Sequence, residues 1–248
     1  MQKFFVNSNQ IKKEEISILG DDVKHMVNVL RVTNGEKILI CNKENHKSYL
    51  AVIENVNKNS VDCKIEKEIE ETTELKFKLD VFQGLPKAEK MELIIQKLTE
   101  IGVTKFIPIK MERCVVKLQS KDEAKKIERW QKIAEVASKQ SKRDIIPTVN
   151  NVEDIAKICE KIGQYDIFIV AYEEEKNKTL KDVLKQEKEK IKDGKIAILV
   201  GPEGGISKKE IDMLAKNGAK IITLGSRILR TETAPIVLAS NIVYELDM

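Results

Sequence analysis

The feature that most constrains the fold is a glycine-rich loop close to the C-terminal end of the sequence. The apolar run at 196–200 predicts a buried strand, and it leads directly into Gly201-Pro202-Glu203-Gly204-Gly205. Ser207 and Glu210 follow with the spacing of a capping box, which predicts a helix start. Glycines let the backbone approach a bound molecule closely, and N–H groups at a helix start are good donors. The segment predicts a ligand-binding loop, with a tight strand-to-helix turn as the alternative.

Two common phosphate-binding loops are excluded by the spacing and the position of this segment. It lacks the Gly-Lys-Ser/Thr ending of a P-loop, and its glycines do not follow the GxGxxG pattern. A Rossmann glycine loop follows the first strand of its sheet, whereas only 43 residues follow Gly205 here. The predicted ligand loop therefore comes near the end of its sheet's sequence.

A second polar segment follows the last predicted strand, at 219–224. Residues 225–234 contain two arginines, a glutamate and two threonines, and Pro235 then suits the first turn of a closing helix. Such a cluster is costly to bury unless its groups are paired or face a ligand. Helix capping by Thr231 or Thr233, with the arginines in solvent, explains the threonines but not the whole cluster.

The N-terminal part of the sequence has a different pattern from the rest. Residues 1–74 contain short strands, and they predict a small β-barrel with a helix at 21–29. The strands are expected at 37–41, 48–54 and 61–65. The polar run 66–74 has the composition of a connector. From residue 75 onward strands alternate with helices, so an α/β domain with a parallel sheet is expected over 75–248.

The charge distribution favours a polyanionic partner. Residues 84–143 hold 15 Lys/Arg against 8 Asp/Glu, although solvated helix faces would also explain this excess. Only six of the 44 basic residues are arginines, which suggests that each is kept for its planar, bidentate fork. They are Arg31, Arg113, Arg129, Arg143, Arg227 and Arg230.

Other classes of protein are disfavoured by the composition. The four cysteines, Cys41, Cys63, Cys114 and Cys159, are too far apart for a CxxC pair, so no metal site or disulfide framework is expected. Two histidines give little support to a hydrolase triad. No run approaches the ~20 apolar residues that a bilayer requires, and the N-terminus lacks a signal peptide, so a cytoplasmic protein without membrane association is expected.

Five segments of the sequence form a distinctive set: VGPEGGIS (200–207), LGSRILRTETA (224–234), KLTEIGVTKFIPI (97–109), ERWQKIAEVASKQSKR (128–143) and VLRV (29–32). Together they resemble the ribosomal small subunit methyltransferase E family, within the SPOUT methyltransferases. The resemblance implies an N-terminal PUA-like β-barrel for RNA, a C-terminal SPOUT-type α/β domain with a trefoil knot, and a homodimer. The implied reaction is methylation of N3 of a uridine in 16S rRNA of the small ribosomal subunit, with S-adenosylmethionine as cofactor and without a metal.

The resemblance also implies roles for individual residues. The expected cofactor-binding residues are Ala171, Leu199, Gly201, Glu203, Gly204, Gly205, Leu224, Gly225, Ile228, Leu229 and Ala234. The expected RNA-binding residues are Lys3, Arg31, Arg113, Gln140 and Arg143, although the family usually has an arginine where Lys3 stands. Because uracil N3 carries a proton at neutral pH, Arg230 is expected to stabilise the imide anion, and Glu232 to accept the proton or to orient Arg230.

Two other functions are compatible with the same loops. One is a SPOUT ribose 2′-O-methyltransferase, and the other is a catalytically silent RNA-binding factor for ribosome assembly. The intact glycines together with Arg230 and Glu232 favour catalysis. The dimer would use the apolar stripe of the closing helix, formed by Ile236, Val237, Ser240, Val243 and Tyr244, unless this stripe is buried within its own domain.

Overall fold

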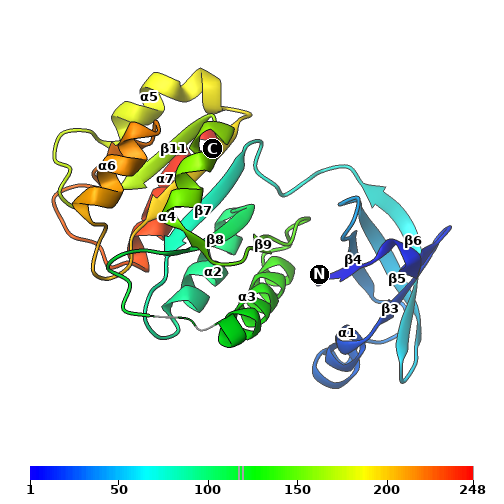
Figure 1. Ribbon diagram of the computed structural model, residues 1–248. Helices are drawn as coiled ribbons and strands as arrows, with labels where there is room; N and C mark the ends of the chain where they lie inside the picture. The colour runs from blue at the N-terminus through cyan, green and yellow to red at the C-terminus, as the bar shows by residue number, and fades with distance from the viewer. Residues whose placement is uncertain (117, 119, 248) are drawn as a thin grey trace. The chain divides into compact units, whose positions relative to one another are not determined.

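The computed structural model describes residues 1–116, 118 and 120–247, and the chain divides into two compact units (Figure 1). The first unit consists of Met1–Glu74 and Ser138–Ile146, and the second of Leu75–Ala137 and the chain from Pro147 onward. The boundary at residue 74 coincides with the one expected from the sequence. The segment Ser138–Ile146, however, belongs to the first unit, whereas the sequence pattern places it in the second domain.

The first unit contains one six-stranded sheet with the strand order β1-β4-β5-β6-β3-β2. Its strands are β1 (Lys3–Val6), β2 (Ile11–Lys12), β3 (Glu15–Leu19), β4 (Lys37–Asn42), β5 (Ser48–Val56) and β6 (Ser60–Ile69). β1 pairs with β4 in parallel, and all other neighbouring strands are antiparallel. Alternate side chains of the sheet, among them Phe4, Ile16, Ile40 and Ile53, form one core with Met26.

The helices of this unit and the end of β6 refine the sequence-based expectations. The 3-10 helix η1 spans Ser8–Gln10, and the helix expected at 21–29 is formed by α1 (Asp21–Lys24) and the π-helix η2 (His25–Leu30). The prediction of a connector over 66–74 is wrong for its first residues, because β6 continues to Ile69 along its pairing with β5. An antiparallel strand with a solvated face is polar at alternate positions, so a low apolar content did not mark its end.

The second unit is built on a parallel sheet with the strand order β10-β8-β7-β12-β11-β13, and β9 pairs with β8. The strands are β7 (Lys78–Gly84), β8 (Lys105–Lys110), β9 (Thr148–Val149), β10 (Glu153–Asp154), β11 (Ile167–Ala171), β12 (Lys195–Val200) and β13 (Lys220–Ile222). The helices are α2 (Lys90–Ile101), α3 (Ser120–Gln140), α4 (Ile155–Lys161), the 3-10 helix η3 (Ile162–Gln164), α5 (Leu180–Ile191), α6 (Lys208–Lys216) and α7 (Thr233–Leu246).

Helices surround this sheet as expected for an α/β domain. α4 and α6 share one core with the sheet, which includes Ile158, Phe168 and Leu214. α7 contacts β12 and also packs against α2 and α5. Since the strands are parallel, their carboxyl ends meet at one edge, and the loops after β11, β12 and β13 begin there. The predicted α/β class is confirmed, while the trefoil knot stays a prediction. None of the described helices is long and apolar enough to cross a membrane.

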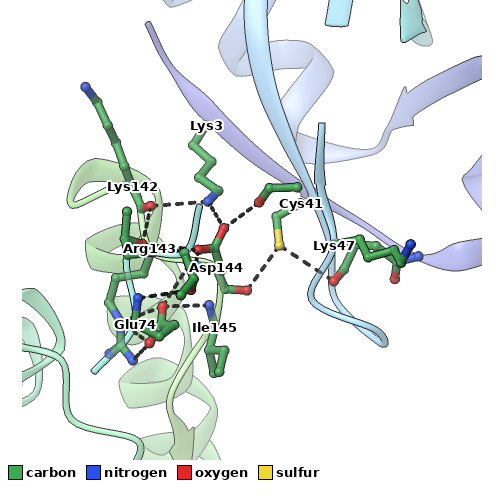
Figure 2. A network of polar contacts seen from close by, with 12 residues as sticks. Lys3, Cys41, Lys47, Glu74, Lys142, Arg143, Asp144 and Ile145 are labelled. Carbon is green, nitrogen blue, oxygen red and sulfur yellow. Dashed lines mark hydrogen bonds and ion pairs between the residues drawn. The ribbon is translucent and has the colours of Figure 1, made fainter. Parts of the chain in front are cut away.

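A buried carboxylate, Asp144, organises the polar centre of the first unit (Figure 2). It forms a buried ion pair with Lys3 and accepts a hydrogen bond from the hydroxyl of Ser48. The hydroxyl of Thr72 and the N–H of Thr73 donate to its second oxygen at 3.1 and 3.0 Å. Burial raises the pKa of Asp144, but the hydrogen bonds from Lys3, Ser48 and Thr73 lower it by more, so the pKa lies below its usual value.

A second carboxylate, Glu74, lies beside this centre and is also fully engaged (Figure 2). It forms an ion pair with the guanidinium of Arg143 and accepts the N–H groups of Asp144 and Ile145 at 2.8 and 3.1 Å. Arg143 and Lys3 are 3% and 5% exposed, respectively. The two carboxylates therefore fix the segment Ser138–Ile146 to the N-terminal strands by buried, charge-assisted hydrogen bonds.

We predict that Asp144→Asn destabilises the first unit by about 3–5 kcal/mol, because it leaves the ammonium of Lys3 buried without a counter-charge. Chemical denaturation with hydrogen exchange of the β4 and β5 amides would measure and localise the effect. Because the pKa of Asp144 is lowered in the folded chain, its contribution is present above the unfolded pKa of ~3.9 and is lost below it. The difference between the two proteins should therefore shrink as the pH falls through this region.

The control for this prediction is Glu66→Gln, which removes an exposed ion pair between Glu66 and Lys37 on the same sheet. Exposed pairs contribute little, so this variant should unfold like the unchanged protein. Equal stability of Asp144→Asn and Glu66→Gln at neutral pH would contradict the central role of Asp144.

Candidate active site

The second unit contains a cavity of about 440 Å³, lined by residues that follow β11, β12 and β13. Ten of the eleven residues predicted to bind a cofactor line it: Ala171, Gly201, Glu203, Gly204, Gly205, Leu224, Gly225, Ile228, Leu229 and Ala234. The eleventh, Leu199, is fully buried within β12 and lies in the core instead. The segments 200–207 and 224–234 thus lie around one cavity, as the family resemblance implies.

The glycine loop is held in shape by close backbone packing. The N–H of Gly205 donates to the carbonyl of Pro202 at 2.9 Å, and Gly205 has a φ of 71°, which favours glycine. A Cβ on Gly204 would lie 2.9 Å from the carbonyl oxygen of Arg113. The guanidinium of Arg113 donates to the carbonyl of Gly204 at 3.2 Å. Gly204 is therefore required for packing against Arg113, whatever the cavity binds.

The start of α6 confirms the predicted capping box. The N–H of Ser207 donates to the carboxylate of Glu210 at 3.0 Å, and the Ser207 hydroxyl accepts from the N–H of Glu210. The N–H of Glu210, in the first turn, is thus already paired with the hydroxyl of the N-cap residue Ser207. The loop ahead of Ser207 is the part that faces the cavity.

Thr231 links the two loops that form the cavity. Its hydroxyl donates to the carbonyl of Gly201 at 2.7 Å, and it accepts from the side-chain amide of Gln83 at 3.1 Å. The same amide of Gln83, at the end of β7, lies 3.3 Å from the carbonyl of Gly201. The interpretation of Thr231 as a helix cap is therefore wrong, because α7 has Glu232 at its N-cap and Thr231 bonds to the glycine loop.

The charged groups at the cavity include a lysine that the sequence analysis did not identify. Lys90, in the first turn of α2, lines the cavity and forms ion pairs with Glu203 at 3.0 Å and with Glu232 at 3.1 Å. Its hydrogen bonds to the two carboxylates raise the pKa of Lys90. Arg230 also lines the cavity and is exposed, as a group that meets a ligand must be.

The two carboxylates are held in their ionised forms. Burial raises the pKa of Glu203, but hydrogen bonds from the N–H of Lys87, from its own N–H and from Lys90 lower it by more. Burial likewise raises the pKa of Glu232, while its own N–H, Lys90 and the charge of Arg230 lower it to a value below normal. A carboxylate with a lowered pKa is a weak proton acceptor. Of the two roles expected for Glu232, acceptance of the proton or orientation of Arg230, its lowered pKa disfavours the first.

Of the five residues predicted to bind RNA, three are exposed and two are buried. Arg31, Arg113 and Gln140 are exposed, and Arg31 ends η2 with a left-handed backbone. The assignment of Lys3 and Arg143 to RNA binding is wrong, because both side chains are buried against Asp144 and Glu74 and cannot reach a phosphate. Their charges serve the ion pairs of the first unit instead.

Gln83 and Lys90 are the groups that sequence reasoning missed. Both lie at the carboxyl end of β7 or just after it, at the sheet edge where the cavity opens. The sequence pattern indicated their role only through their position at or after the end of one strand of the parallel sheet, β7. Among the described residues, no group of three or more His, Cys, Asp or Glu side chains is arranged to hold a metal ion.

Comparisons with known proteins place these observations in a family. The profile of the RNA methyltransferase domain matches residues 73–243, and that of the RNA methyltransferase PUA domain matches residues 18–66. The Ribosomal RNA small subunit methyltransferase E of Bacillus subtilis is 36% identical over 252 residues, which cover 100% of this chain and 98% of that protein. The protein of the same name from Mesomycoplasma hyopneumoniae is 32% identical, with 99% and 100% covered.

A solved structure agrees with the sequence comparisons. The Ribosomal RNA small subunit methyltransferase E from Neisseria gonorrhoeae, bound to S-adenosyl methionine, has a TM-score of 0.86 to this chain. The two chains are 28% identical, and the match covers 98% of this chain and 97% of that one.

Proposed function

The chain belongs to the ribosomal RNA small subunit methyltransferase E family, and we propose that it methylates N3 of a uridine in 16S rRNA with S-adenosylmethionine as methyl donor. One observation carries the proposal: the cavity of the second unit is lined by the two motifs, 200–207 and 224–234, that resemble this family. The first unit, with its PUA-like sheet, would bind the RNA.

The cavity fits S-adenosylmethionine in size and in lining. Its volume of about 440 Å³ is in the usual range for small-molecule sites. Ala171, Leu224 and Leu229 offer apolar surface for an adenine ring, and the glycine loop offers backbone groups for polar atoms. We assign cofactor binding to the ten predicted residues that line the cavity, and a supporting role to Leu199. The bound cofactor would supply an electrophilic methyl group.

Arg230 is proposed as the catalytic residue. Uracil N3 becomes nucleophilic only after it loses its proton, which leaves a negative charge shared with the carbonyl oxygens. The exposed guanidinium of Arg230, at the cavity wall, can stabilise this charge through fixed hydrogen bonds. We propose that the proton passes to solvent and that Glu232 stays ionised in its ion pair with Lys90.

The RNA and a second copy of the chain are the proposed macromolecular partners. Arg31, Arg113 and Gln140 are the proposed RNA contacts, since they are the exposed members of the predicted set. A homodimer through α7 is proposed, because Tyr244 is 71% exposed and Ser240 is exposed, so both are accessible to a second copy. Val243 is buried in its own unit and is not part of the proposed contact. We also propose a cytoplasmic location, where ribosomal RNA is found.

The decisive experiment on the substrate is mass spectrometry of 16S rRNA from cells that lack the gene. The proposal requires that N3-methyluridine is lost from these cells and restored by the gene. Gain of a missing ribose 2′-O-methyl group on restoration would establish the 2′-O-methyltransferase instead. Unchanged RNA modification together with a defect in subunit assembly would establish the catalytically silent factor.

Calorimetric titration tests the cofactor site. We predict that the protein binds S-adenosylmethionine in EDTA and that Ala171→Phe abolishes the binding heat, because the aromatic ring fills space at the cavity wall. The matched control, Ala156→Phe, places the same ring at an exposed position on α4 and should bind like the unchanged protein. Equal binding by both variants would refute the cavity as the cofactor site.

Single-turnover kinetics test Arg230. We predict that Arg230→Lys, which keeps the charge but loses the planar fork, lowers the rate of methyl transfer by about 10²-fold at saturating cofactor and ribosomal subunits. The matched control is Arg129→Lys, which alters an exposed arginine paired with Glu92 on the second unit and should leave the rate unchanged. If Arg230→Lys weakens only RNA binding and keeps the rate, Arg230 binds a phosphate and is not catalytic.

A further inference from the structure

Lys90 stands out among the residues that line the cavity, because it carries a positive charge and belongs to neither of the two cavity motifs. It lies in the first turn of α2, and it faces the cavity together with Arg230. Its ammonium contacts carboxylates from two different loops, Glu203 in the glycine loop and Glu232 at the N-cap of α7. The three side chains are 28%, 25% and 18% exposed, respectively, so water screens their charges only in part.

The two carboxylates create an electrostatic difficulty for the proposed reaction. Removal of the N3 proton produces an anion in the uracil ring, and nearby negative charges oppose its formation. Glu232 also lies two residues from Arg230, and the charge of Arg230 acts on its carboxylate. An unpaired Glu232 would compete with the uracil anion for the guanidinium.

The position of Lys90 removes this difficulty. Its ammonium forms ion pairs with Glu203 at 3.0 Å and with Glu232 at 3.1 Å, so one cation neutralises charge on both carboxylates. The N–H of Lys87 also donates to the carboxylate of Glu203, at 3.0 Å to the oxygen that Lys90 contacts and at 3.3 Å to the other. The charged groups that act on Lys90 are Glu203 and Glu232, and Arg230 acts on Glu232 in turn.

We infer that Lys90 is a positioning residue for methyl transfer, which holds Glu203 and Glu232 in ion pairs and so keeps Arg230 free for the uracil anion. The inference rests on the proposed function. It assigns Lys90 an action through Arg230 rather than contact with the substrate. The reaction therefore depends on a residue that follows β7 and lies outside both cavity motifs.

The first test compares Lys90→Met with Lys90→Arg in single-turnover methylation of small ribosomal subunits, at saturating cofactor and from about pH 6 to 9. Lys90→Met should lower the rate by about 10²-fold. It should also move the inflection of the pH profile upward, because the exposed negative charge opposes deprotonation of N3. Lys90→Arg keeps the cation and should retain most of the rate.

The control variant is Lys97→Met, on the same helix, where the lysine is paired with Glu100 on the surface. It should keep both the rate and the pH profile. Thermal unfolding of all variants separates a loss of fold from a loss of rate. A wild-type rate and profile in Lys90→Met would overturn the inference, and so would a loss confined to cofactor affinity.

The second test is a double-mutant cycle of Lys90→Met with Glu232→Gln. If Lys90 acts by holding Glu232 away from Arg230, its removal should cost much less in the Glu232→Gln background. An equal loss of rate in both backgrounds would show that Lys90 acts in another way and would refute the inference. Absence of methylation by the wild-type protein in the same assay would refute the proposed function, and the role of Lys90 would fall with it.

Discussion

The parallel pairing of β7 with β12 is the constraint on which the rest of the second unit depends. The two strands lie more than a hundred residues apart in the sequence, and their register sets Gln83 opposite Val200. It thereby places the end of β7 against the glycine loop, so closely that a Cβ on Gly84 would lie 2.6 Å from the ring of Pro202. From this contact follow the bonds of Gln83 to Gly201 and Thr231 and the reach of Lys90 to both carboxylates. The shape of the cavity thus depends on the register between β7 and β12.

Much of this arrangement could be predicted from the sequence, because it depends on local patterns. The strand before Gly201 and the capping box at Ser207 both depend on neighbours within a few residues. Most residues of the cavity could be named because they lie in the two motifs, 200–207 and 224–234, through which the chain resembles its family. Gln83 and Lys90 could not be found in this way, since each acquires its partners only when distant strands and loops meet.

The errors have a common physical origin. Lys3 and Arg143 carry the charge expected of residues that bind RNA, and no local pattern distinguishes them from exposed cations. Their carboxylate partners, Asp144 and Glu74, are about 70 to 140 residues away along the chain. The extent of β6 was missed for a similar reason, because its last residues are held by hydrogen bonds to β5 rather than by burial of apolar side chains.

The discontinuous first unit has a consequence for the order in which the protein can fold during its synthesis. When the ribosome has made residues 1–74, Lys3 and Ser48 are present but Asp144, which must pair with them, does not yet exist. An incomplete first unit must then bury a cation without a partner or remain partly open. β7, α2, β8 and most of α3 are synthesised before the missing segment, Ser138–Ile146, is complete. The N-terminal part therefore cannot reach its final state ahead of the elements that follow it, and a fragment cut after Glu74 would lack the group that completes it.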